Sequence, residues 1–420
     1  MKSRGWLRYE TVLMVLLSLN FGIVFFDRNA MSYLGPFVQK DLGLTNAHIG
    51  LIASGFSLAW GLSGFVGGTV IDRLGHRKLF LVSATAVFSV CSLISGLAAT
   101  FGVLIAARML MGVFEGPMNP VQQSFAAAES SPRSRGLSMG FVQNFGSNLI
   151  GSGLAPLIIT ALAVSFGWRK AFFVSAAPGL LMALLIFLIV REPKVDKSAA
   201  GAAVAAAPRM SMLQMLRHRN VWLSMVISLF SVPWMILGWT FLPLLYANYR
   251  RFDPSVSSGL MAVLGFSAAL GAFVLPGLSD RIGRRPVLIF GSFLGAGVPL
   301  AALYWSGPVW GLGAALFVCW LASGTFPLFM GTIPSETISA RYVATVCGLT
   351  QGLGEAVGGF IAPTAAGKAA DLWGLPAAMW IMCACAVISG LLAIFLKETA
   401  PAKVGLSEPA LAEATAPQPY

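Results

Sequence analysis

The sequence predicts an all-α membrane protein, with twelve transmembrane helices in two six-helix bundles and both termini on the cytoplasmic side. The first observation is composition: 57% of the 420 residues are hydrophobic and only 10% are charged, whereas soluble domains carry about 25% charged residues. The second is that the hydrophobic residues form stretches long enough to cross a bilayer, which takes about 20 apolar residues per helix. The third is a long polar interruption after the sixth stretch.

Twelve hydrophobic stretches follow one another along the chain, at residues 11–35, 47–71, 79–98, 102–128, 136–163, 168–190, 220–247, 256–278, 286–305, 308–333, 343–367 and 375–396. The first contains charged residues and no small-residue cleavage site follows it, so we expect an uncleaved span rather than a secretory signal. This order predicts four segments: an N-terminal six-helix bundle over 1–190, a cytoplasmic linker loop over 191–219, a C-terminal six-helix bundle over 220–397 and a cytoplasmic tail over 398–420.

Basic residues are concentrated on one side of the predicted membrane. With both termini inside, twenty of the 28 Lys and Arg residues fall in cytoplasmic segments and six in outer segments. This is the bias that the positive-inside rule describes, and we expect a multi-pass protein of the cell (inner) membrane. Topology therefore explains the formal net charge of +12, and no nucleic-acid partner is expected.

The two halves repeat one another. The loop "GGTVIDRLGHRK" (67–78) follows the second stretch, and "LPGLSDRIGRRP" (275–286) follows the eighth. A repeat of six spans with matching loops implies two bundles related by an axis along the membrane normal. Secondary transporters use this arrangement to place a substrate site between two halves.

The paired D-R-x-G-[HR]-R loops resemble the signature of the major facilitator superfamily, and the resemblance covers essentially the whole chain. It implies that these loops latch the cytoplasmic side when the transporter faces outward. The gating-loop candidates are Gly68, Asp72, Arg73, Gly75 and Arg77 in the first copy, and Asp280, Arg281, Gly283 and Arg284 in the second. Pro276 replaces the first glycine of the second copy. The alternative is that the basic residues only set topology.

Five ionisable residues lie well inside predicted spans: Asp27, Arg28, Arg108, Glu115 and Glu355. A charge at the bilayer centre costs roughly 2.5–3.5 kcal/mol on insertion scales, so each is a functional candidate. Arg108 and Glu115 are seven residues apart, which places them on one helix face about 10 Å apart. We expect the charges of the first and fourth spans to pair with one another.

The three histidines fall in or beside loops, at His48, His76 and His218. A proton pathway inside the membrane must therefore use carboxylates, and we assign proton coupling to Asp27 and Glu115. An arginine stays charged and presents a planar fork that suits a substrate carboxylate. This assigns Arg28 to the anion.

The stretches "FDRNAMS" and "ARMLMGVFEGPMNP" resemble the anion:cation symporter branch of the superfamily, which includes bacterial sugar-acid and aromatic-acid carriers and sialin-type transporters. The resemblance implies proton-coupled import of an organic anion. It carries over Asp27 and Arg28 on the first span, and Glu115 with Arg108 as a charge network on the fourth. The alternative is a static buried network, although buried ion pairs stabilise poorly compared with apolar packing.

Glu355, in "QGLGEAVGGFIAP", departs from the sugar-acid carriers, which tend to have Asn there. We expect it to line the cavity, as a further proton site or as a substrate contact. The alternative is a wetted helix face without a role. The other substrate-binding candidates are Trp60, Gln143, Asn144, Asn148, Trp234 and Trp239. For the tryptophans, packing is the alternative.

The sequence thus favours a secondary active transporter that takes up a small organic anion, a carboxylate, in symport with H⁺ by alternating access. The main alternative is a proton-antiport exporter of a drug or metabolite, because transport direction is not written in the sequence. A minor alternative is a non-transporting membrane sensor. The chain contains no G-x-x-x-x-G-K-[ST] loop, so no pump is expected, and its sequence places no histidine or metal-ligand cluster at the centre of a span, so no enzyme is expected.

The expected partners are the organic anion, H⁺ and the lipid bilayer, and we expect a monomer. The five cysteines all lie in apolar stretches, where free cysteine acts as a small hydrophobic residue. We therefore expect no disulfide, no metal site and no cofactor.

Overall fold

A computed structural model describes residues 3–74, 76–129, 141–142, 146–192, 212–338 and 340–404. These residues form helices joined by short connections, and no strand occurs among them. Ten of the described helical stretches are long and apolar enough to cross a membrane. The predicted all-α membrane architecture is confirmed. The count of twelve spans and the cytoplasmic termini stay predictions.

The described helices of the N-terminal half are α1 (Ser3–Leu42), α2 (Asn46–Leu74), α3 (Arg77–Leu97), α4 (Phe101–Glu115), α5 (Met118–Glu129), η2 (Ser147–Leu154), α7 (Ala155–Phe166) and α8 (Trp168–Ile189). The first helix extends beyond its predicted end at residue 35 and includes Pro36. The fourth predicted span is divided between α4 and α5, and η2 and α7 form the described part of the fifth.

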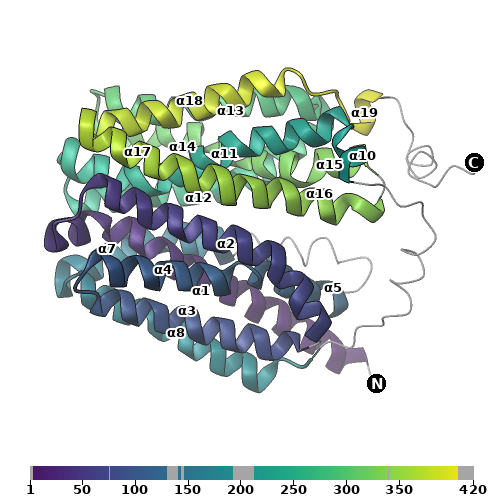
Figure 1. Ribbon diagram of the computed structural model, residues 1–420, viewed down its shortest axis with the longest axis horizontal. Coiled ribbons are helices and arrows are strands. Elements are labelled where there is room, and N and C mark those ends of the chain that lie inside the picture. Colours follow the sequence, from purple (N-terminus) through teal and green to yellow (C-terminus); the bar gives the residue numbers. More distant parts are fainter. Residues whose placement is uncertain are drawn as a thin grey trace, which may run out of the picture.

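The C-terminal half contains α11 (Arg219–Leu244), η3 (Leu245–Tyr249), α12 (Pro254–Ile282), α13 (Arg284–Tyr304), α14 (Val309–Trp320), η4 (Leu321–Thr325), η5 (Leu328–Thr332), α15 (Ile333–Thr337), α16 (Ala340–Leu353), η6 (Gly354–Gly358), α17 (Gly359–Trp373) and α18 (Leu375–Ala393). Two short helices, α10 (Met212–Leu216) and α19 (Pro401–Val404), lie outside the long helices. The two halves lie side by side with their long helices roughly aligned (Figure 1).

Several long helices contain π-helical turns, at η2, η3, η5 and η6. Such turns are rare and frequently occur at functional sites. Glu355 is part of η6, so this predicted site residue of the C-terminal half lies on irregular helix.

The two halves are tightly packed at the end of the molecule where α2 begins and α17 ends. A Cβ atom on Gly50 of α2 would lie 2.2 Å from the carbonyl oxygen of Pro363 on α17, so only glycine permits this approach. The carboxylate of Asp371 accepts hydrogen bonds from the backbone N–H groups of Asn46 and Ala47, at 2.8 and 2.9 Å. An acid at a helix N-terminus also interacts favourably with the helix dipole. These contacts seal one end of the boundary between the halves.

Candidate functional site

A cavity of about 240 Å³ lies between the two halves. Its lining comes from α2, the α4–α5 segment and α16, and consists of Trp60, Gly61, Gly64, Gly116, Asn119, Pro120, Gln123, Gly348, Gln351 and Gly352. The amide side chains supply hydrogen-bonding groups and the glycines supply space. A few polar groups in an otherwise apolar lining are typical of a small-molecule site.

The guanidinium group of Arg28 is held by aromatic rings. Its central carbon lies 4.7 Å from the ring centroid of Phe56, 5.3 Å from that of Phe25 and 5.4 Å from that of Trp60. Trp60 also lines the cavity. Among the described residues, no hydrogen bond or ion pair occupies the N–H groups of Arg28, and an arginine presents five of them. The rings hold the cation by cation–π attraction and leave its donors for another group.

The neighbouring side chain, Asp27, faces the interior of the N-terminal half. It is fully buried, and its Oδ1 atom accepts hydrogen bonds from the hydroxyl groups of Ser92 at 2.5 Å and Ser175 at 3.0 Å. Its Oδ2 atom has no hydrogen-bond partner in the described structure. Consecutive helix residues point about 100° apart. Asp27 and Arg28 therefore have different surroundings.

Arg108 and Glu115 complete a buried set of charges. The Nη1 atom of Arg108 donates to the backbone carbonyl oxygen of Asp27 at 3.3 Å, and its guanidinium lies 4.7 Å from the ring centroid of Phe172. Both carboxylate oxygens of Glu115 are buried without a hydrogen-bond partner among the described residues. The expected link between the first and fourth spans thus exists, but through a backbone carbonyl. The two serine hydroxyls already occupy one oxygen of the Asp27 carboxylate.

Glu355 lies at the boundary between the halves. Its side chain is 4% exposed and accepts a hydrogen bond from the hydroxyl of Ser57 on α2. Its second oxygen, Oε2, is buried without a hydrogen-bond partner in the described structure. The cationic group that acts on it electrostatically is Arg28. The alternative of a wetted helix face therefore does not hold.

The other candidates lie in varied places. Trp234 is buried inside the C-terminal half, where its indole N–H donates to the carbonyl of Gly295 at 3.0 Å. It stacks on Trp320, with centroids 4.7 Å apart, and Trp239 contacts the same ring at 5.2 Å. The structure thus places Trp234 in packing contact with Trp320 and satisfies its N–H group, and the substrate contact of Trp234 stays a prediction. Asn148 is half-buried in η2 and does not line the cavity.

Some predicted residues cannot be placed. Gln143, Asn144 and Gly75 lie outside the described residues. The backbone of Gly68, Asp72 and Arg73 is part of α2, but their side chains are also outside the description.

Sequence reasoning missed several polar residues of the site. Glu115, Asn119 and Gln123 recur every four residues, which is the spacing of one helix face. Gln351 precedes Glu355 by the same interval. This periodicity was a signal that these amides belong with the acids.

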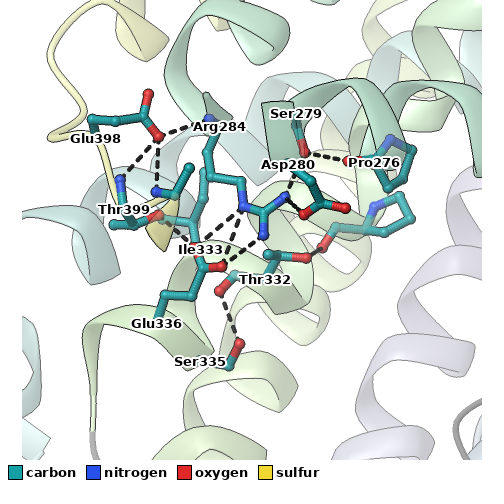
Figure 2. Close-up of polar contacts among 12 residues, drawn as sticks. Pro276, Ser279, Asp280, Arg284, Thr332, Ile333, Ser335, Glu336, Glu398 and Thr399 are labelled. Atoms are coloured by element: carbon teal, nitrogen blue, oxygen red, sulfur yellow. Dashed lines mark hydrogen bonds and ion pairs between the residues drawn. The ribbon is translucent and has the colours of Figure 1, made fainter. Parts of the chain in front are cut away.

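The predicted gating loop of the C-terminal half forms a polar network (Figure 2). Arg284 donates to Asp280 at 2.5 Å and to Glu336 at 2.8 Å. Gly283, between α12 and α13, has a φ of 122°, which favours glycine. Arg281 is exposed. The network joins the end of α12 and the start of α13 to α15.

Glu398 caps the N-terminus of α13 beside this network. Its carboxylate accepts hydrogen bonds from the backbone N–H groups of Arg284 at 2.7 Å and Arg285 at 3.2 Å. Burial acts to raise the pKa of Glu398, but its hydrogen bonds to backbone N–H groups outweigh burial, and the pKa lies below its ordinary value. Glu192 caps α3 in the same way, through the N–H groups of Arg77 and Lys78 at 2.7 and 2.9 Å. The repeat thus extends to an acid after the last long helix of each half.

The sequence profile of the Major Facilitator Superfamily matches residues 17–363. The chain belongs to this family, and it is a membrane transporter rather than an enzyme. Both predictions are confirmed.

Similar proteins carry names of acid transporters. The chain is 32% identical over 277 residues to a probable 4-methylmuconolactone transporter of Cupriavidus pinatubonensis, a match covering 63% of this chain and 61% of that protein. It is 28% identical over 405 residues to a probable L-galactonate transporter of Escherichia coli, covering 83% and 88%. The fold resembles the crystal structure of a D-xylose-proton symporter, with a TM-score of 0.73, 18% identity and coverage of 94% and 99%.

Proposed function

We propose that this transporter takes up a small organic carboxylate in symport with H⁺, by alternating access across the cell (inner) membrane. Twelve spans with both termini in the cytoplasm belong to the same proposal, as does a monomeric state. The observation that carries it is Arg28, whose guanidinium is supported by three aromatic rings, has no described hydrogen-bond acceptor, and shares Trp60 with the cavity. A planar, permanently charged fork suits a carboxylate.

We assign the proton to two acids, Asp27 and Glu115, and not to the Arg28 site. Asp27 and Glu115 are buried in the N-terminal half, and three of their four carboxylate oxygens have no hydrogen-bond partner among the described residues. Ionisable residues inside a membrane commonly mark proton or ion pathways. Arg108 acts electrostatically on both acids and balances their charge when they gain or lose protons. The relatives' names, which include galactonate, hexuronate and sulfoacetate transporters, support an acid as the substrate.

Alternating access is supported by the unequal ends of the boundary between the halves. The end at Gly50 and Pro363 is sealed, while the cavity lies between α2, α4, α5 and α16. With cytoplasmic termini, this is an inward-facing state. The two signature loops would then latch the opposite end when the transporter faces outward.

The test is transport by the purified protein in liposomes. D-galactonate, D-glucuronate, 3-(3-hydroxyphenyl)propionate and sulfoacetate are offered outside with an acidic exterior, and accumulation above the outside concentration is expected for at least one of them. Arg28→Lys should weaken binding of that acid by about tenfold or more, because lysine lacks the bidentate fork. Arg251→Lys, at an exposed loop position, is the matched control and should bind normally.

The alternatives give different results in the same assay. Accumulation of a cationic compound only when the vesicle interior is acidic would favour the proton-antiport exporter. Binding of an acid without any flux, in wild-type protein that is correctly inserted, would favour the sensor. Unchanged affinity in Arg28→Lys would remove Arg28 from the anion site.

A further inference from the structure

Glu355 is placed where the two halves meet. It is the second residue of η6, the π-helical turn between α16 and α17, and η6 packs against α11 of its own half and α2 of the other. Its side chain is 4% exposed, and one carboxylate oxygen has no described hydrogen-bond partner. A buried acid of this kind needs a counter-charge or a proton.

The counter-charge for Glu355 is Arg28 of the other half, and both groups contact α2. Phe56 and Trp60, four residues apart, carry the guanidinium of Arg28. Ser57, beside Phe56, hydrogen-bonds Glu355. One helix face therefore brings an acid of the C-terminal half and an arginine of the N-terminal half into electrostatic contact, without a direct ion pair between them.

The other surroundings of Glu355 supply no second cation among the described residues. On α11, the residues against η6 are Ser228, Leu229, Val232 and Pro233, none of which titrates. On α16, the polar residue one turn earlier is Gln351. Arg28 also acts electrostatically on Glu115 of α4, inside the N-terminal half.

We propose that Glu355 is a built-in competitor for Arg28: ionised, it neutralises the guanidinium across the boundary between the halves, and protonated, it frees the guanidinium for the substrate carboxylate. This inference rests on the proposed function and adds a third proton-linked acid to it. The proton is taken up from the aqueous cavity onto the carboxylate of Glu355 and is released when the substrate leaves. Two ionised carboxylates beside one half-buried guanidinium would leave an uncompensated negative charge, which is costly in a site partly shielded from water.

The substrate class follows from the neutral form of this acid. A protonated carboxyl group donates one hydrogen bond and accepts others, so it complements a hydroxyl group near the substrate carboxylate. Glu355 is not itself among the residues that line the cavity, but the amides of Asn119, Gln123 and Gln351 are, and they offer the same type of contact. The site therefore favours hydroxylated monocarboxylates over simple fatty acids or dicarboxylates.

The competition makes a quantitative prediction about binding. When one proton must be bound together with each substrate, the apparent dissociation constant rises about tenfold for each pH unit above the titration of that group. Asp27 and Glu115 contribute their own proton linkage. Removing Glu355 should therefore lower the slope of log Kd against pH by about one, instead of abolishing it.

The experiment measures this slope by titration calorimetry on full-length protein in detergent, from about pH 5 to pH 9. The probes are D-galactonate, D-glucuronate, 3-(3-hydroxyphenyl)propionate and unsubstituted 3-phenylpropionate. Glu355→Gln, which keeps the shape and mimics the neutral acid, should reduce the slope by about one and bind the preferred acid at least tenfold more tightly than wild type at the alkaline end. Proton uptake on binding, from calorimetry in two buffers of different ionisation enthalpy, should fall by about one.

Gln351→Ala is the matched control, because Gln351 lies one helical turn before Glu355, lines the cavity and does not titrate. It should weaken binding equally at all pH values and keep the wild-type slope. A wild-type slope in Glu355→Gln would overturn the inference even if binding and transport are normal, and so would uniform weakening at every pH. Failure of all four acids to bind the folded wild-type protein would overturn the proposed function together with the inference.

Discussion

The two halves of this transporter share a fold but have different interiors. The N-terminal half buries Asp27, Arg108 and Glu115, and several of their polar atoms have no described hydrogen-bond partner. The interior of the C-terminal half contains tryptophan rings stacked around Trp320. The indole N–H of Trp234, in this stack, donates a hydrogen bond to the backbone carbonyl of Gly295. Because both halves form the same kind of bundle, the fold does not require the charges. The difference teaches that a buried set of charges is a feature of one half, while the other half has a stacked aromatic interior and places Glu355 at the boundary between the halves.

Removing one acid of the N-terminal half should give the largest effect. Asp27→Asn should abolish accumulation driven by a pH gradient in liposomes, because the amide cannot exchange a proton, while exchange of internal for external substrate persists. Trp234→Phe, which loses one indole hydrogen bond in the C-terminal half, should keep accumulation within about twofold of wild type. Equal loss in both variants would contradict the division between the halves.

The packing role of the C-terminal half is tested at its central ring. Trp320→Ala should lower stability by about 3–5 kcal/mol, because it removes a fully buried ring and leaves a cavity between Trp234 and Trp239. Thermal unfolding in detergent measures the effect. Trp310→Ala is the matched control on the same helix, since Trp310 is 79% exposed, and its melting temperature should stay close to wild type.

The seal between the halves is tested by adding one methyl group. Gly50→Ala places Cβ 2.2 Å from a backbone carbonyl of α17, so α2 and α17 must separate and the sealed end should open. Spin labels on the two helix ends should report a longer distance, and transport should slow several-fold. Gly259→Ala has no atom within 4 Å of its new Cβ, and the distance and rate should match wild type.

The smallest effect concerns the cap on α13. The pKa of Glu398 is below its ordinary value, so its stabilising effect is present at neutral pH and is lost as pH falls through the folded-state pKa. Glu398→Gln should lower the melting temperature at pH 7, and the difference from wild type should shrink near pH 4, about the ordinary pKa of glutamic acid. Thr399→Val removes the hydroxyl bond to Glu336 without removing a titrating group. Its difference should therefore change less with pH, and parallel behaviour of both variants would count against the cap.

Composition and spacing were enough to predict the helical membrane fold and the list of charges inside predicted spans, and the paired D-R-x-G-[HR]-R loops carried the resemblance to the transporter family. These properties are local: a bilayer demands long apolar helices, and a charge inside one is conspicuous in any arrangement. The four-residue spacing of Glu115, Asn119 and Gln123 is also present in the sequence, and it is the spacing of one helix face.

Only the tertiary structure decided which groups meet. In the structure, two serines on α3 and α8, and not Arg108, donate hydrogen bonds to the Asp27 carboxylate. Trp234 lies inside the C-terminal half, and Glu355 lies beside Ser57 of the opposite half. A helix sequence specifies which residues share a face, but not which helix packs against that face. That choice depends on close packing between segments far apart in the chain, and it determines which buried charges find a partner.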